Sequence, residues 1–191
     1  MAGHPIPPLT EEEYLTLDRA AEYKSEFMDG HMYAMSGGTL RHSSLAVRLM
    51  SELSLQLMGR KCTVFNSDAR VRSAKGRSYF YPDISVVCGE AQTHEDSDDI
   101  LINPSLIVEV LSPSTADYDH GKKFAHYREI ATLRDYLLVH PDEPLIEQFA
   151  RQGDGKWLLS EYRAGKAWSI WIRSIAMSPW RGFMRTNALT G

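Results

Sequence analysis

Two apolar runs near the middle of the chain are each interrupted by a single carboxylate. Residues 106–111 read Leu-Ile-Val-Glu-Val-Leu, with Glu109 as their one charged residue and a proline near each end of the run. A short β-branched and aliphatic run of this kind predicts a buried strand rather than a helix. Residues 81–88 predict a second such strand, with Asp83 near its start. Because burial of an unpaired carboxylate is costly, both acids are expected to have a partner.

Apolar residues at helical spacing predict the longest helix of the chain over residues 40–58. Thr39 precedes this segment and has the side chain of a good N-cap. The apolar stripe is wide enough to form a face that packs on the core. Its members are Leu45, Val47, Leu49, Met50, Leu53 and Leu57.

Turn and capping signals predict the remaining elements. Thr10 and Glu13 form a capping-box pattern at the start of a helix that runs to about Arg19. Turn residues at 114–119 precede a second predicted helix over 116–130. Asp29-Gly30 is a strong hairpin signal. It joins predicted strands at 24–28 and 31–35. An exposed acidic loop is predicted at 89–103. Further strands are predicted at 62–65, 69–72, 134–139, 146–151, 157–162 and 168–172.

Strands and helices in this order indicate an α/β protein, and 191 residues are enough for one domain with a substantial core. We expect a single domain over 1–191, with an extended segment at 1–9, the folded region at 10–180 and a tail at 181–191. A hydrophobic content of 43% and a charged content of 24% are ordinary for a soluble globular protein.

The net charge of −4 argues against an overall basic surface, which nucleic-acid-binding proteins often have. A local basic run precedes the Asp83 strand. This run is either a patch for a nucleic-acid backbone or a solvated hairpin loop, and it consists of Arg70, Arg72, Lys75 and Arg77.

The two cysteines, Cys62 and Cys88, lie on strand-like segments and have neither the spacing nor the histidine neighbours of a zinc site. We therefore expect two buried, free thiols in a reducing compartment. The N-terminus lacks the basic and apolar regions of a signal peptide, and no apolar run has the length of a membrane-spanning helix. These features predict a cytoplasmic protein without a membrane partner.

Two neighbouring strands that each carry an acid offer the hard oxygen ligands that a divalent metal ion requires. Lys123 and Tyr127 share a face of the predicted 116–130 helix. A lysine beside two carboxylates and a metal ion would position a water or stabilise charge on a phosphate. Each residue also has a simpler interpretation: Asp83 opens a strand or caps a turn, Glu109 pairs with an arginine in the core, and Lys123 lies on a solvated helix face.

Three motifs together resemble the Uma-type "putative restriction endonuclease" family, a branch of the PD-(D/E)XK nuclease superfamily. They are Tyr-Pro-Asp-Ile-Ser-Val-Val at 81–87, Pro-Ser-Leu-Ile-Val-Glu-Val-Leu-Ser-Pro-Ser-Thr at 104–115, and the segment from Lys123 to Tyr127. Residues 23–30, which include Glu26 and Asp29-Gly30, are similar to the Glu-x-x-Asp-Gly hairpin of that family. The resemblance extends over roughly residues 14–181.

This resemblance implies a restriction-endonuclease-like α/β fold, with a mixed central sheet flanked by helices, an extra N-terminal hairpin and extra C-terminal strands. It also implies a Mg²⁺-dependent (or Mn²⁺-dependent) endonuclease that hydrolyses DNA phosphodiester bonds and forms a homodimer. The implied metal ligands are Asp83, Glu109 and the backbone carbonyl of Val110, and the implied catalytic residues are Asp83, Glu109, Lys123 and Glu26.

One departure from the superfamily pattern concerns the lysine. In the simple motif it stands two residues after the strand acid, where this chain has Leu111. The family places the lysine on the following helix, and the spacing to Tyr127 favours Lys123 over its neighbour Lys122. By the same resemblance, Tyr127 helps to position Lys123 and His42 is a candidate for substrate or metal contact. His42 is equally well explained as a solvated or capping residue, and Glu26 as a surface strand residue.

Two rival functions fit the same residues. In the first, the chain is a non-catalytic nucleic-acid-binding or interaction module that keeps the fold and vestigial acids. In the second, the chain is a metal-dependent hydrolase of small phosphate esters, which the net negative charge leaves open.

Overall fold

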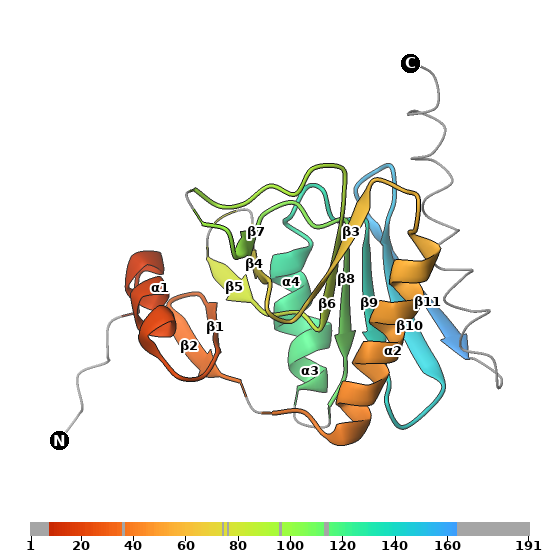
Figure 1. Ribbon diagram of the computed structural model, residues 1–191, viewed down its shortest axis with the longest axis horizontal. Coiled ribbons are helices and arrows are strands. Elements are labelled where there is room, and N and C mark those ends of the chain that lie inside the picture. The colour runs from red at the N-terminus through yellow and green to blue at the C-terminus, as the bar shows by residue number, and fades with distance from the viewer. Residues whose placement is uncertain are drawn as a thin grey trace, which may run out of the picture.

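A six-stranded mixed sheet forms the centre of the computed structural model (Figure 1). The structure describes residues 8–35, 37–73, 75, 77–95, 97–112 and 115–163. The strand order is β11-β10-β9-β8-β6-β3. Only β8 and β9 are parallel in this sheet, and they are joined by the helical segment between them. The strands are β3 (Cys62–Asn66), β6 (Ile84–Cys88), β8 (Leu106–Val110), β9 (Asp135–Val139), β10 (Leu145–Arg151) and β11 (Trp157–Arg163).

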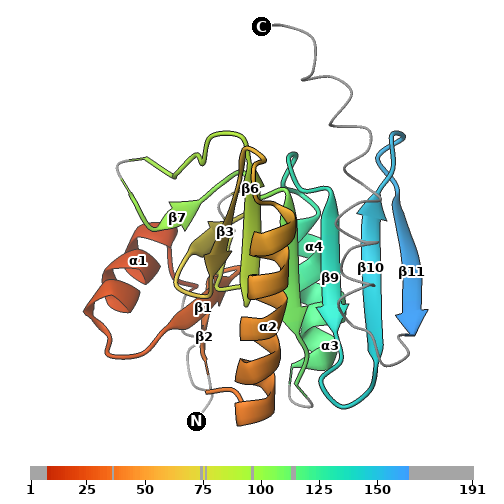
Figure 2. The same ribbon diagram turned by 45° about the vertical axis from the view of Figure 1, so that its right-hand side comes forward.

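Helices cover both faces of this sheet (Figure 2). Helix α2 (Leu40–Gln56) packs one face through Leu49 and Leu53, against alternate strand residues such as Val86 and Val108. The opposite face, with Ile107 among its residues, packs against a helical segment that contributes Phe124 and Tyr127. Alternate residues of β8 therefore point to the two helical layers, as the period of a strand requires. Both cores are continuous and largely apolar.

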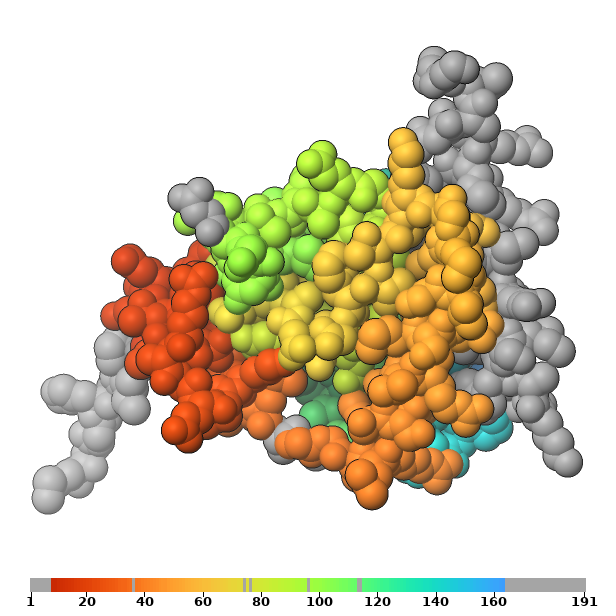
Figure 3. Space-filling view, in the orientation of Figure 1, coloured from red at the N-terminus to blue at the C-terminus, as the bar shows by residue number. Residues whose placement is uncertain are grey.

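A second, five-stranded sheet stands beside the first, where the sequence predicts only an added N-terminal hairpin. Its order is β2-β1-β5-β4-β7, and helix α1 (Glu11–Ala20) packs on it through the fully buried Tyr14. The predicted loop at 89–103 contributes the last strand of this sheet. The strands are β1 (Ser25–Met28), β2 (His31–Ala34), β4 (Arg70–Arg72), β5 (Ser78–Phe80) and β7 (Ile100–Leu101). Figure 3 shows the red N-terminal elements and the orange helix α2 on either side of the yellow and green strands.

The helix predicted over 40–58 is confirmed as α2, with Thr39 accepting a hydrogen bond from the His42 backbone N–H. The stripe is narrower than predicted, because Val47 is 56% exposed. The helix predicted over 116–130 is shorter and divided. It consists of α3 (Ala116–Tyr118), a π-helical turn η1 (Asp119–Lys123) and α4 (Phe124–Tyr127). The strand predicted at 168–172 lies outside the described residues.

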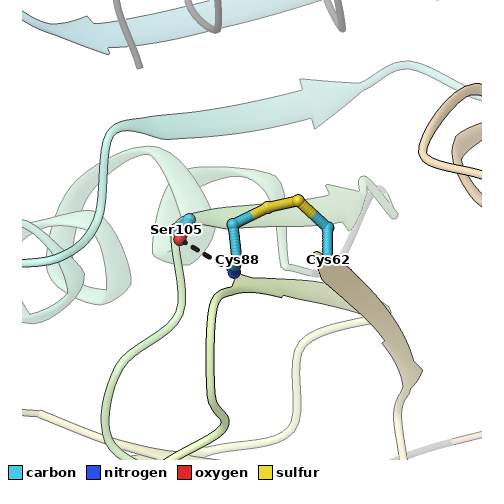
Figure 4. The surroundings of a disulfide bond; sticks show 3 residues. All are labelled: Cys62, Cys88 and Ser105. Atoms are coloured by element: carbon cyan, nitrogen blue, oxygen red, sulfur yellow. Dashed lines mark hydrogen bonds between the residues drawn. A yellow bond between two sulfur atoms is a disulfide. The ribbon is translucent and has the colours of Figure 1, made fainter. Parts of the chain in front are cut away.

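Cys62 and Cys88 form a disulfide, so the prediction of two free thiols is wrong (Figure 4). The two residues are directly opposite each other in the antiparallel pair of β3 and β6, with their Cα atoms 4.0 Å apart. This register places the two sulfur atoms within bonding distance. The Cys88 N–H donates to Ser105 Oγ at 3.3 Å and so fixes one end of the link. The cytoplasmic location expected from the sequence stays a prediction.

The basic run before the Asp83 strand is not an unpaired patch. Each of its four side chains forms an ion pair with a carboxylate of the same chain, and Arg70 is itself buried. Arg70 and Arg72 pair with acids of α1 and so attach that helix to the second sheet. The ion pairs join Arg70 to Asp18 and Asp99, Arg72 to Glu11, Lys75 to Glu129, and Arg77 to Asp29. No helix in the described ranges is both long and apolar enough to cross a bilayer.

Asp135, at the start of β9, is expected to make stability depend on pH. Burial raises its pKa to about 6, against the opposing effect of a 2.7 Å hydrogen bond from Gln148. A carboxyl whose pKa is raised in the folded state favours folding below its unfolded pKa, and this contribution is lost as the pH rises through the folded value. Between pH 4 and pH 7.5, Asp135 should therefore lower the free energy of unfolding by about 2–3 kcal/mol.

Urea unfolding of wild type and Asp135→Asn at a series of pH values measures this contribution. The free energy of unfolding of the variant should lack this part of the pH dependence. Its value relative to that of wild type should therefore increase as the pH rises. Asp142→Asn, at an exposed aspartate, is the matched control. Parallel pH profiles for wild type and Asp135→Asn would contradict the assignment.

Candidate active site

Glu109 of β8 is the centre of the site and is almost fully buried. Its Oε1 atom lies 2.8 Å from Lys123 Nζ and accepts a hydrogen bond of 3.0 Å from Tyr127 Oη. The shared face predicted for Lys123 and Tyr127 is therefore observed, and both side chains reach the same carboxylate oxygen.

Lys123 lies among three carboxylates. Besides Glu109, its Nζ is 2.8 Å from Glu26 Oε1 on β1 and 3.7 Å from Asp119 Oδ1 one turn earlier. All four side chains are less than a tenth exposed. The surface interpretations of Glu26 and Lys123 are therefore wrong, because the two strands and the π-turn enclose both residues. Three acids around one ammonium leave an excess of negative charge in a desolvated place.

The pKa shifts agree with this excess. Burial raises the pKa of Glu109 well above its ordinary value, although Lys123 opposes the rise. Burial alone would lower the pKa of Lys123, but Glu109, Glu26 and Asp119 outweigh it and hold that pKa well above its ordinary value. Burial also raises the pKa of Asp119. Lys123 therefore stays charged, and it is the cation that the buried acids share.

The π-helical turn η1 sets the positions of Asp119 and Lys123. Such turns are short insertions in α-helices and occur often at functional sites. Here the wider turn points both side chains toward the sheet, where each is buried. Asp119 is the site residue that the sequence interpretation missed. Its four-residue spacing to Lys123 was the available signal, since residues at that spacing share a helix face.

Asp83 lies on a second side of the site, directly before β6 rather than inside the strand as predicted. Its Oδ2 atom accepts a 2.7 Å hydrogen bond from the Val110 N–H and lies 3.2 Å from His42 Nε2. The backbone of the residue after Glu109 therefore holds the second acid. Asp83 and His42 are the more accessible members of the site, with side chains 18% and 20% exposed.

His42 comes from the first turn of α2 and points toward Asp83. The hydrogen bond with Asp83 raises the pKa of His42, burial opposes the rise, and a hydrogen bond to the Val110 backbone adds to it. Gly38 lies against the same ring, since a Cβ on this glycine would stand 2.8 Å from His42 Nδ1. The His42 ring is therefore held between the loop and Asp83, with part of its side chain exposed.

Two groups of side chains could hold a metal ion. Asp83 directly before β6, and Glu109 and the Val110 backbone of β8, supply oxygen donors, which is the chemistry that Mg²⁺ or Mn²⁺ prefers. Three carboxyl groups share one ammonium around Glu109, and this surplus of acids also fits a divalent cation. Elsewhere in the described part of the chain, His120, His140 and Glu147 offer three ligand atoms that all lie within 4.8 Å of one another.

Comparisons with known proteins identify relatives of the whole chain. The family model described as "Uma2: Putative restriction endonuclease" matches residues 11–172. Uncharacterized protein slr1290 of Synechocystis is 38% identical over 91% of this chain and 90% of its own length. Uncharacterized protein sll1609 of the same organism is 39% identical over 80% of this chain and 86% of its own length.

A solved structure, described as "a putative nuclease belonging to DUF820" from Anabaena variabilis, has a similar fold. The TM-score is 0.68 at 23% sequence identity, and the match covers 82% of this chain and 86% of that one. The predicted restriction-endonuclease-like α/β fold is confirmed.

Proposed function

The chain belongs to the Uma2 family, and from that premise we propose that it is a Mg²⁺-dependent (or Mn²⁺-dependent) endonuclease that hydrolyses DNA phosphodiester bonds. The observation that carries the proposal is the convergence of Asp83, Glu109 and Lys123 at the end of β8. Lys123 lies 2.8 Å from Glu109, and Asp83 is hydrogen-bonded to the next residue of the same strand.

Asp83, Glu109 and the Val110 carbonyl would hold the metal ion. The Val110 N–H already fixes the Asp83 carboxylate, and Tyr127 fixes Glu109, so the oxygen ligands are oriented before any ion binds. When bound, a divalent ion at such a site polarises the phosphate and lowers the pKa of its water. His42 keeps Asp83 oriented, and its partial exposure gives it access to substrate.

Lys123 would act on the reacting groups directly. Its ammonium carries a fixed positive charge in a place with little solvent, where it stabilises negative charge developing on the phosphate or orients the attacking water. Glu26 also contacts the ammonium, at 2.8 Å, and accepts a 3.2 Å hydrogen bond from the Tyr81 N–H. Glu26 thereby supplies an additional acid beside the ligands.

A plasmid-nicking assay with Mg²⁺ tests this function. Asp83→Asn should lower the nicking rate by about 10²–10³-fold, because one carboxylate ligand is lost and the ion supplies several kcal/mol of transition-state stabilisation. Asp154→Asn, at an exposed turn between β10 and β11, is the matched control and should keep the wild-type rate. Equal nicking by wild type and Asp83→Asn would refute the proposed role of Asp83.

One observation favours a second candidate function, the hydrolysis of small phosphate esters. The four basic residues before Asp83 are all paired within the chain, so they offer no unneutralised surface to a nucleic-acid backbone. A higher catalytic efficiency on a small chromogenic phosphodiester than on any DNA would favour this second function.

The homodimer also remains a proposal, and sedimentation equilibrium tests it.

A further inference from the structure

His120, His140 and Glu147 lie together beside the carboxylate site but take no part in the proposed hydrolysis. His120 is part of η1, His140 follows the end of β9, and Glu147 is on β10. The Nε2 atoms of both histidines lie close to one oxygen, Glu147 Oε1, at 2.9 Å from His120 and 2.8 Å from His140.

The register of the sheet explains why these residues meet. Glu147 is opposite Leu138 of β9, and His140 follows Leu138 by two residues. Because side chains alternate along a strand, both point to the face on which η1 packs. His120 reaches them from that turn. The three ligands therefore come from three separate elements that the fold brings together.

A backbone hydrogen bond orients His120 as a ligand. Its Nδ1 atom is 2.7 Å from the Ala116 carbonyl oxygen. A carbonyl only accepts, so Nδ1 carries the hydrogen and Nε2 is the ring nitrogen that faces Glu147. Metal-binding histidines are commonly held in this way, with the second ring nitrogen donating to a carbonyl or a carboxylate. A lone pair that faces a carboxylate oxygen requires a proton or a cation between them.

We propose that His120, His140 and Glu147 form a second metal site, for a divalent transition-metal ion such as Zn²⁺. Two imidazoles and one carboxylate are a ligand set that zinc uses in proteins. Zn–N and Zn–O bonds of about 2.0–2.1 Å in a tetrahedral site separate the ligand atoms by about 3.3 Å. The observed 2.8 and 2.9 Å separations thus need to widen by only about 0.4–0.5 Å. Solvent supplies the fourth ligand, since the His120 and His140 side chains are 35% and 22% exposed.

This second site adjoins the first along η1. His120 directly follows Asp119, whose carboxylate lies 3.7 Å from Lys123 Nζ. In addition, Glu109 and Glu147 are both paired with Leu138, from the two neighbouring strands. The two acids therefore lie on the same face of the sheet, about 10 Å apart at their Cα atoms. A metal ion at the second site would bind η1 to the sheet, and η1 contains Lys123.

Calorimetric titration of Zn²⁺ into the tag-free, chelator-treated full chain tests the site. Wild type should bind one equivalent at this site, and His140→Ala and Glu147→Gln should each weaken that binding by more than about 100-fold, as expected for loss of a direct ligand. His31→Ala is the control for removing an exposed histidine elsewhere, and it should bind as wild type does. Circular dichroism verifies that each variant is folded.

Glu109→Gln separates the two sites in the same experiment. This variant removes an acid of the first site only, so it should still bind Zn²⁺ with wild-type affinity. Co²⁺ provides an independent readout, because a tetrahedral site gives it strong visible absorption that His140→Ala should abolish. Absence of Zn²⁺ binding by wild type, unchanged binding by His140→Ala and Glu147→Gln, or loss of binding in Glu109→Gln alone would overturn the proposal.

Discussion

Lys123→Met is expected to lower the free energy of unfolding by about 3–5 kcal/mol at neutral pH in the presence of a chelator. Lys123 Nζ contacts Glu26 and Glu109 at 2.8 Å each, and Asp119 lies at 3.7 Å. Methionine fills a similar volume but removes the charge, so three buried carboxylates lose the cation they share. Urea unfolding followed by circular dichroism measures the change.

Two further variants distinguish this cause from general damage. Lys156→Met, at a lysine whose side chain is 82% exposed, should change stability by less than about 0.5 kcal/mol. Adding Glu109→Gln to Lys123→Met should recover part of the loss, because it removes one of the unpaired charges. A loss of similar size in both single lysine variants would contradict the assigned role of Lys123.

Glu109→Gln is expected to separate activity from stability. It should lower Mg²⁺-dependent nicking by about 10²–10³-fold, because an oxygen ligand of the proposed ion becomes a neutral amide. The free energy of unfolding at pH 7.5 should nevertheless be unchanged or higher. Lys123 and Tyr127 both contact one side-chain oxygen of Glu109, and glutamine retains such an oxygen.

The sign of the stability effect follows from the pKa of Glu109. Burial raises this pKa well above the ordinary value in the folded state. The contribution of such a carboxyl to stability is present below its unfolded pKa of about 4.3 and is lost as the pH rises through the folded value. Glutamine has no such loss. The difference in unfolding free energy between the variant and wild type should therefore grow with pH, and a large destabilisation at pH 7.5 would refute this account.

The local pattern of apolar and polar residues was sufficient to predict the strand and helices that contain most residues of the first site. The aliphatic run around Glu109 is β8, the leucine stripe is α2, and the four-residue spacing of Lys123 and Tyr127 brings both to Glu109. These features depend on the strand and helix periods, which can be read directly from the order of apolar and polar residues. The two strands that each carry one acid suggested Asp83 and Glu109 as a pair, and the resemblance added Glu26 and the Val110 carbonyl, which no local period indicates.

Features that depend on register or on irregular backbone could not be predicted in this way. The Cys62–Cys88 disulfide exists because β3 and β6 pair in one particular register. Asp119 and His120 are placed by a π-helical turn, where a regular helix would be the natural prediction. Glu147 meets His120 across 27 residues of sequence, and no motif marks the pair. The partners of the basic run come likewise from distant elements.

The central claim is that Asp83 and Glu109 hold a catalytic divalent ion, and calorimetric titration of Mg²⁺ tests it most directly. Mg²⁺ suits this measurement because it prefers oxygen ligands and so discriminates against the histidine-containing site. Wild type should bind Mg²⁺ and nick plasmid DNA, and Glu109→Gln should lose both in the same samples while remaining folded. Failure of wild type to bind Mg²⁺ or Mn²⁺, or equal binding by Glu109→Gln, would contradict the claim and leave the buried acids with a purely structural role.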